Sequence, residues 1–163
     1  MPNLFVRHAT SADTAAIAEL EAMCFPPTEV ASYASFESRI SVFPDRFWLL
    51  FEDGRLVSMV EGFLTNDAIL HDCMFADATL HDPIGRWQMI FGVATCPDRQ
   101  RHGYAGLLLK SMLEQCQREG RAGVVLTCKP AKIAYYAKFG FVDEGVSESE
   151  HGGEIWHQMR IEF

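Results

Sequence analysis

Short continuous apolar runs recur along the chain, and runs of this length are typical of buried strands. The clearest are Phe47–Phe51, Trp87–Thr95 and Val124–Cys128. The Asp53-Gly54 pair separates the first run from Leu56–Val60, and this dipeptide between apolar segments predicts a two-residue hairpin turn. We therefore expect a β-sheet whose strands are spread over most of the sequence.

Segments with helical spacing lie between these runs. In the first of them, Ile17, Leu20 and Met23 share one face. Ser11 is the expected N-cap of this helix, and Pro26-Pro27 ends it. The other predicted elements are strands at Phe5–Thr10, Phe141–Val146 and Glu154–Ile161, and helices at Thr28–Ile40, near Asp67–Phe75, at His102–Gly120 and from Pro130 to Phe139-Gly140. A hairpin sheet followed by strand, helix, strand and helix predicts a mixed α/β fold.

Composition sets the size and class of the molecule. The chain has 163 residues, of which 48% are hydrophobic and 22% charged, and this is enough apolar material for a core. It contains no internal repeat and no low-complexity linker. We therefore expect residues 1–163 to form a single domain.

Charge and cysteine usage exclude several classes of partner. The net charge of −8 argues against nucleic acid or an anionic membrane as the main partner. No apolar run reaches the length of a membrane span, and the first residues lack a signal-peptide pattern. The five cysteines lack CxxC spacing, which indicates reduced thiols and neither a disulfide framework nor a zinc site. The expected protein is cytoplasmic and holds no metal.

The segment Gln100–Ala105 has the most informative surroundings, because it joins an apolar run to a helix-patterned segment. The first N–H groups of a helix have no intrahelical partner and lie at the positive end of its dipole, so a strand, a tight turn and a helix start together favour an anion site. Gly103 and Ala105 leave the backbone accessible to a ligand. The alternative is a turn that merely caps the helix. A nucleotide P-loop is excluded, because no Lys-Ser/Thr pair follows the glycine.

The element order and this turn resemble the GNAT acetyltransferases, whose Q/R-x-x-G-x-G/A signature the turn matches at every specified position. Pro97 before the turn and Tyr135–Phe141 after it fit the same pattern. Within that family the chain resembles the arylalkylamine (serotonin-type) N-acetyltransferases, in the segments Glu21–Phe25, Phe51–Val57, Leu80–Pro83 and Tyr136–Phe141. The resemblance implies a single-domain GNAT fold: an α/β protein with a mixed, mostly antiparallel sheet, a splayed central strand pair and flanking helices.

The same resemblance implies that acetyl-CoA is the cosubstrate. The main-chain N–H groups of the turn and helix start would hold the pyrophosphate, and one edge of the preceding strand would pair with the pantetheine arm like an added strand. A strand N–H would also polarise the thioester oxygen. The implied cofactor-binding residues are Val93, Ala94, Thr95, Arg101, His102, Gly103, Tyr104, Ala105 and Gly106. The competing interpretation of Val93–Thr95 is an ordinary core strand.

Tyr136 is the predicted general acid, which would protonate the departing thiolate. A phenol with an ordinary pKa of about 10 is a fair match to an alkyl thiolate. Tyr135 points about 100° away on a helix, and the family pattern selects Tyr136. The alternative is that both tyrosines are core or surface aromatic residues.

No general base is predicted. The arylalkylamine enzymes carry two histidines one residue apart on the strand before the turn, and the matching positions here are Met89 and Phe91. The substitutes are Glu61, His81, Asp82 and His151, each of which also has a purely structural interpretation. The remaining alternative is an amine that loses its proton to solvent before it reaches the thioester.

The expected substrate is less sharply defined. The Pro26-Pro27 loop would cover the amine, with apolar walls drawn from Phe25, Tyr33, Phe36 and Phe75, although a core role for most of these is the simpler interpretation. A covalent route through Cys24 or Cys96 would need a paired histidine, and the spacing shows none.

The predicted function is acetyl transfer from acetyl-CoA to the primary amine of a small, arylalkylamine-like molecule, by direct attack in a ternary complex. One alternative is a protein or peptide N-acetyltransferase, and another is a non-catalytic acyl-CoA sensor. The resemblance also leaves room for a homodimer through the last strands.

Overall fold

The computed structural model describes residues 1–163, which form two compact units. The first consists of Met1–Glu61 with Gly92–Met112, and the second of Gly62–Phe91 with Leu113–Phe163. The chain therefore passes from one unit to the other three times, and each unit contains its own sheet.

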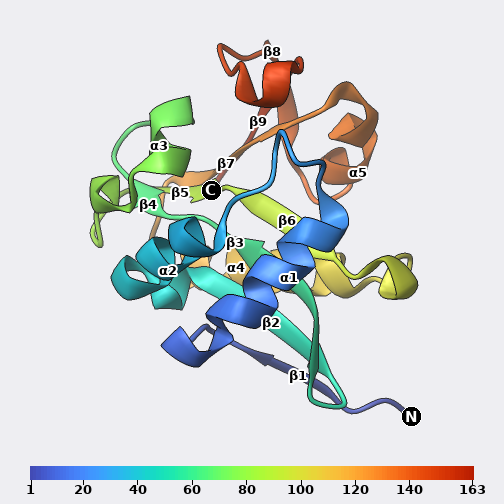
Figure 1. Cartoon of the computed structure of the whole chain (residues 1–163). Coiled ribbons are helices and arrows are strands. Elements are labelled where there is room, and N and C mark those ends of the chain that lie inside the picture. The colour runs from blue at the N-terminus through green and yellow to red at the C-terminus, as the bar shows by residue number, and fades with distance from the viewer. The chain divides into compact units, whose positions relative to one another are not determined.

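The sheet of the first unit is antiparallel, with strand order β1-β2-β3-β6 (Figure 1). Its strands are β1 (Leu4–Arg7), β2 (Phe47–Glu52), β3 (Arg55–Glu61) and β6 (Gly92–Thr95). Asp53 and Gly54 join β2 to β3 with positive φ angles of 50° and 84°, which is the backbone that a tight hairpin turn requires. The predicted hairpin is confirmed.

Two helices of the first unit pack beside this sheet. Helix α1 (Thr14–Cys24) lies against β3 and β6, and α2 (Tyr33–Val42) packs on α1 (Figure 1). The predicted N-cap at Ser11 is wrong: the helical segment starts with a 3₁₀ turn at Ser11, and Thr10 precedes it, with its N–H donating to the Asp13 carboxylate at 2.7 Å. The second helix begins later than the predicted Thr28, because residues 26–30 fold into a turn.

The core of the first unit is aromatic. Phe36, Phe43 and Phe47 are fully buried, and the rings of Phe43 and Phe47 stack with centroids 5.8 Å apart. The Phe36 ring meets the Phe47 ring edge-on at 6.4 Å. Phe36 is therefore a core residue, which agrees with the simpler of the two interpretations of its sequence position.

The sheet of the second unit has strand order β4-β5-β7-β9-β8. Only the β5–β7 pair is parallel. The short strand β4 was not predicted, because two residues carry no periodicity. The strands are β4 (Leu64–Thr65), β5 (Trp87–Ile90), β7 (Gly123–Cys128), β8 (Val142–Val146) and β9 (His157–Glu162).

Three helices complete the description. Helix α3 (Asp72–Ala76) is shorter than the segment predicted near Asp67–Phe75. Helix α4 (Tyr104–Arg118) begins in the first unit and ends in the second. Helix α5 (Ile133–Ala137) follows a 3₁₀ turn that starts at Pro130, and Gly140 comes after it with a φ of 103°.

The apolar run Trp87–Thr95, predicted as one strand, is divided at Phe91. Its first half, β5, pairs with β7, whereas its second half, β6, pairs with β3 alone. Gly92 follows the break, where a bulge was expected. The predicted separation of the central strands is thus visible in the hydrogen-bond pairing: β5 pairs with β7, and β6 does not.

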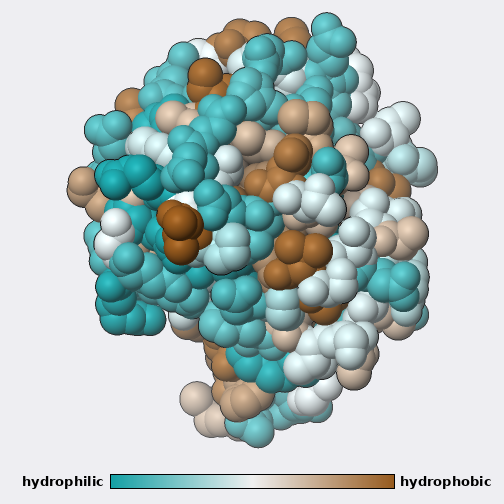
Figure 2. Space-filling view, turned by 90° about the vertical axis from the view of Figure 1, so that its left-hand side faces the viewer, coloured by the Kyte–Doolittle hydropathy of each residue, from teal (hydrophilic) through white to brown (hydrophobic).

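On the face seen in Figure 2, hydrophobic atoms form small groups among hydrophilic ones. None of the helices has the length and apolar character needed to cross a membrane.

Gly123 tests how tightly the second sheet is packed. A Cβ atom at this position would lie 2.0 Å from the Ile161 carbonyl oxygen and 2.8 Å from the Trp87 ring. Gly123→Ala is expected to lower the free energy of unfolding by about 1–3 kcal/mol in urea denaturation, because backbone and ring must move apart. In the control Gly92→Ala, the nearest atom is 3.7 Å away, and we expect a change within about 0.5 kcal/mol. Equal stability of the two variants would contradict this packing.

Candidate functional site

The predicted phosphate turn lies in the first unit, between β6 and α4. After β6 the chain makes a 3₁₀ turn at Pro97–Arg99 and enters α4 at Tyr104. Arg101 and Gly103 have positive φ angles of 65° and 79°, and alternation of this kind turns successive N–H groups toward one concave side. The main-chain N–H groups of residues 101–106 donate no hydrogen bond within the chain, and the first such bond runs from the Leu107 N–H to the Gly103 carbonyl at 3.0 Å. This turn can therefore accept an anion through its backbone.

Glu52 at the end of β2 accepts hydrogen bonds from residues before and after this turn. One carboxylate oxygen accepts a hydrogen bond from Arg99 Nε at 2.7 Å, and the other accepts one from the Tyr104 hydroxyl at 2.5 Å. The Tyr104 hydroxyl and then Arg99 lower the pKa of Glu52, and the same carboxylate raises the pKa of Tyr104. The Tyr104 side chain is thus engaged in fixing the turn, while its backbone N–H stays available.

The two exposed side chains of the turn differ in their roles. Nδ1 of His102 lies 3.0 Å from the Arg99 carbonyl oxygen and 2.9 Å from that of Gln100. Because carbonyl oxygens only accept hydrogen bonds, Nδ1 carries the proton. His102 therefore closes the turn through its ring, whereas the exposed Arg101 side chain makes no hydrogen bond or ion pair within the chain.

The register of β6 determines which of its backbone groups are free. The Cys96 N–H donates to the Val57 carbonyl at 2.8 Å, and in the β3–β6 register Ala94 stands opposite Met59. Hydrogen-bonded pairs alternate along an antiparallel ladder, so Ala94 faces β3, and Val93 and Thr95 direct their backbone groups to the other side. No strand pairs with that side of β6. The predicted pantetheine edge therefore has free donors and acceptors at Val93 and a free N–H at Thr95.

The carbonyl of Thr95 is the exception on this edge. It accepts a hydrogen bond from the Cys24 thiol, at 3.2 Å from Sγ. Burial raises the pKa of Cys24 to about 11. At neutral pH this thiol keeps its proton, which argues against a nucleophilic role.

Tyr136 lies in the second unit, on α5. Its ring is half-buried and meets those of Tyr135 and Phe141 edge-on, at centroid distances of 5.2 Å and 6.0 Å. Burial raises the pKa of Tyr136 well above that of a free phenol, and the nearby Cys128 adds to the effect. The hydroxyl therefore stays protonated at neutral pH, as a proton donor must.

Glu61, a candidate base, is held in a buried ion pair. Its side chain is 1% exposed, and Oε1 lies 2.5 Å from Nη1 of Arg39. Burial nevertheless raises its pKa. A carboxylate so enclosed meets Arg39 and not a substrate, so its role is structural.

The other three candidate bases also have structural partners in the second unit. His81 Nδ1 accepts a hydrogen bond from the Leu64 N–H at 3.1 Å, which fixes β4. Asp82 accepts from the Ile84 N–H and from the Asn66 side chain, both at 3.1 Å. The His151 ring stacks on Phe75, with centroids 5.5 Å apart. These contacts favour the structural interpretation of all three.

Glu21 on α1 is a functional candidate that sequence reasoning missed. It is 7% exposed, and Oε2 accepts a hydrogen bond from the Ala31 N–H at 2.9 Å. Oε1 points at β6, 3.7 Å from where a Cβ of Gly92 would stand. Burial raises the pKa of Glu21 to about 7, and repulsion by Glu61 adds to the effect. The available signal was its position: Glu21 falls on the apolar face of Ile17 and Leu20, where a carboxylate is out of place.

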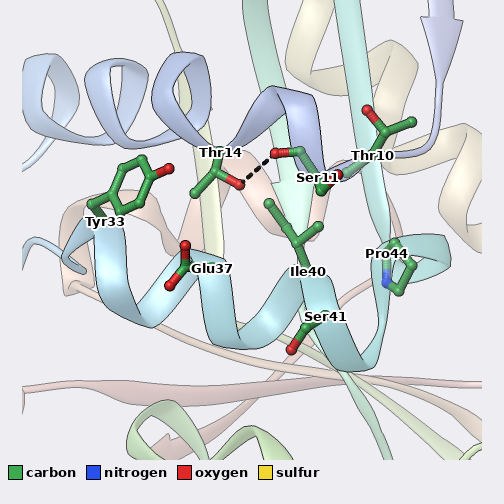
Figure 3. Close-up of a pocket in the computed structure, with 9 residues that line it drawn as sticks. Thr10, Ser11, Thr14, Tyr33, Glu37, Ile40, Ser41 and Pro44 are labelled. Atoms are coloured by element: carbon green, nitrogen blue, oxygen red, sulfur yellow. Dashed lines mark hydrogen bonds between the residues drawn. The ribbon is translucent and has the colours of Figure 1, made fainter.

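A cavity of about 270 Å³ opens elsewhere in the first unit, between the start of α1 and α2 (Figure 3). Tyr33, Glu37 and Ile40 of α2 line one side, facing Thr14, whose hydroxyl donates to the Ser11 carbonyl at 3.0 Å. None of the predicted cofactor-binding residues lines this cavity. It is therefore separate from the turn and from β6.

Comparison with known proteins agrees with this geometry. A family model described as an acetyltransferase (GNAT) domain matches residues 5–142. Among curated protein sequences, none matches the chain significantly.

Several solved structures share the fold at low sequence identity. The loading GNATL domain of CurA from Lyngbya majuscula is 15% identical over 98% of both chains, with a TM-score of 0.85. The GphF GNAT-like decarboxylase in complex with isobutyryl-CoA is 22% identical over 97% of this chain and 98% of its own, with a TM-score of 0.81. The ribosomal-protein-S18-alanine N-acetyltransferase from Escherichia coli is 18% identical over 98% of this chain and 94% of its own, with a TM-score of 0.74. The chain has the α/β fold of these proteins and belongs to the family of GNAT acetyltransferase domains.

Proposed function

We propose that this chain transfers the acetyl group of acetyl-CoA to the primary amine of a small molecule. The observation that supports it is the pair of unfilled backbone sites in the first unit: the N–H groups of residues 101–106 and the free edge of β6 at Val93 and Thr95. A pyrophosphate fits the first, and the amide-containing pantetheine arm fits the second. The Val93 N–H is then the donor for the thioester oxygen.

Charge supports an amine as the acceptor. The chain carries a net charge of −8, and Glu21 places a carboxylate beside β6. A cationic amine is attracted to such a site, whereas the carboxylate of a malonyl-type thioester is repelled. This favours amine acetylation over the decarboxylation named for the GphF domain.

Aromatic contacts in the second unit support an arylalkylamine. Phe91 stands at the break before β6, and its ring lies 4.9 Å from the ring of Phe75, which in turn stacks on His151. These half-buried rings form an aromatic cluster, and an aryl group is the kind of substituent that such a cluster favours. Tyr33, by contrast, lines the separate cavity of Figure 3.

Tyr136 is the general acid in this proposal. When the C–S bond breaks, its hydroxyl protonates the leaving thiolate. The hydroxyl carries its proton at neutral pH, and its raised pKa makes it a weaker acid than a free phenol. The reaction is a direct attack of the amine on the thioester, with no acyl-cysteine intermediate, because the Cys24 thiol stays protonated.

A substrate screen distinguishes this function from its competitors. Purified protein is incubated with acetyl-CoA and one of tryptamine-like amines, polyamines or peptides, and release of free CoA is recorded. We expect the highest kcat/KM with arylalkylamines. Turnover of peptides alone would favour the protein acetyltransferase, and binding of acetyl-CoA without turnover of any acceptor would favour the sensor. Malonyl-CoA and isobutyryl-CoA in place of acetyl-CoA test the choice of acyl group.

Gly103→Val tests the phosphate turn. Valine at a φ of 79° is strained and must distort the turn, so we expect affinity for acetyl-CoA to fall at least about tenfold in isothermal titration calorimetry. Gly120→Val is the matched control, since Gly120 follows the other end of α4 with a φ of 74° and has equally open surroundings. Equal affinities of the two variants would contradict the assignment of the turn.

Tyr136→Phe removes the proposed acid and keeps the ring. We expect kcat to fall by roughly 10²-fold or less, with unchanged affinity for acetyl-CoA. Tyr135→Phe, one residue away, is the control and should leave kcat unchanged. A Tyr136→Phe enzyme with wild-type kcat would refute the role of this hydroxyl.

A further inference from the structure

We infer that Glu21 is the proton acceptor for the incoming amine, through its Oε1 oxygen beside Gly92. The inference rests on the proposed function, to which it adds the missing base. It stands on the position of one buried carboxylate in the first unit, and it does not depend on the histidine pair that Met89 and Phe91 replace.

The two oxygens of Glu21 have different surroundings. Oε2 is tied to the Ala31 N–H at 2.9 Å, at the end of the loop that starts with Pro26-Pro27. Oε1 has no hydrogen-bond partner in the chain and points at the first residue of β6. An anchored carboxylate with one free oxygen is the arrangement that a general base needs, because the anchor fixes the direction of the free lone pairs.

Oε1 of Glu21 meets β6 at Gly92. Gly92 and Ala94 present the same face of β6, and α1 packs against β6. Oε1 lies 3.7 Å from where a Cβ of Gly92 would stand, which is an ordinary contact distance, so the carboxylate reaches this face of the strand. The adjacent Val93 N–H is the proposed donor to the thioester oxygen, so the proposed acyl site begins one residue along β6 from the Glu21 carboxylate.

The charged groups around Glu21 set its proton affinity. Glu61 on β3 faces it and repels its charge, and Arg39 on α2 attracts it. Cys24, one turn further along α1, is neutral at this pH, and β6 contributes no titratable group on the facing side. Burial has the largest effect, and together these groups place the pKa of Glu21 at about 7. A base with this pKa is unprotonated in part at neutral pH and still strong enough to take a proton from an ammonium in contact with it.

The protons balance as follows. Glu21 takes one proton from the ammonium, and the neutral nitrogen forms the C–N bond with the thioester carbon. The C–S bond breaks, and Tyr136 protonates the thiolate. The nitrogen loses its second proton, which restores the Tyr136 phenol through solvent. Glu21 then returns its proton to bulk water, so that one proton is released for each amide formed.

Glu21→Gln, with Glu19→Gln as control, tests this assignment. Gln keeps an acceptor for the Ala31 N–H and removes the base, and Glu19 is an exposed carboxylate on the same helix. In the wild type, kcat/KM for a tryptamine-like amine should fall as pH drops below about 7. For Glu21→Gln we expect this decrease near pH 7 to disappear from the pH profile, and kcat/KM at pH 7 to fall by about 10²–10⁴-fold. The activity of the variant should rise only at higher pH, where the amine loses its proton to solvent. Acetyl-CoA affinity should be unchanged in both variants.

A second measurement tests the protonation itself without any substrate. A carboxyl group whose pKa is raised in the folded state stabilises the protein at low pH, and this stabilisation is lost as pH rises from 4.5 to about 7. The melting temperature of Glu21→Gln relative to the wild type should therefore increase between pH 5 and pH 8, and that of Glu19→Gln should not.

The outcomes separate the two proposals. A wild type that acetylates amines, together with a Glu21→Gln variant of equal rate and unchanged pH profile, would overturn the role of Glu21 alone. A wild type that binds acetyl-CoA but acetylates no amine would overturn the proposed function, and the assignment of Glu21 with it.

Discussion

An interrupted hydrogen-bond ladder is the constraint on which the candidate site depends. The apolar run from Trp87 to Thr95 would be a continuous strand by sequence, but its pairing changes at Phe91: β5 belongs to one sheet and β6 to another. Unpaired backbone groups within a sheet are unfavourable unless something else satisfies them. No strand of the chain pairs with the outer backbone groups of Val93 and Thr95. A ligand with amide groups of its own can form these hydrogen bonds instead.

The rest of the first unit supports this edge and the turn that follows it. Glu52 fixes the turn through Arg99 and Tyr104, so the free N–H groups of residues 101–106 keep their direction before a ligand arrives. Donors positioned in advance bind an anion without a further ordering cost. Helix α1 lies on the same strand and brings the buried Glu21 to its first residue. The proposed cofactor contacts and the proposed base therefore lie on β6, on the turn that follows it and on the helix packed against it.

Much of the fold could be predicted from the sequence because its signals are local. The Asp53-Gly54 turn, the long helix after Gly103 and the strand Val124–Cys128 each depend on neighbouring residues, and all three were placed within a few residues. Elements with weak local signals were not found. The strand β4 is two residues long, and the start of α2 depends on the turn at residues 26–30.

The turn before α4 could be predicted for the same reason, since its motif is contiguous. For Glu21 the sequence shows only a carboxylate on an apolar helix face. Its raised pKa and its neighbours come from residues far apart in the sequence, because the packing of α1 on the sheet brings Arg39, Glu61 and Gly92 around it. The buried surroundings of Glu61 and Glu21 changed the role expected for each. Glu61 was considered as a base and is enclosed with Arg39, whereas Glu21 was treated only as part of a motif.

Hydrogen–deuterium exchange of the whole chain, with and without acetyl-CoA, tests the central claim most directly. If the cofactor completes the ladder of β6 and the start of α4, amide exchange should slow at Val93, at Thr95 and across residues 101–106, and remain unchanged at the exposed amides beside the cavity of Figure 3. Saturating acetyl-CoA that leaves these amides exchanging at their free rates would contradict the account.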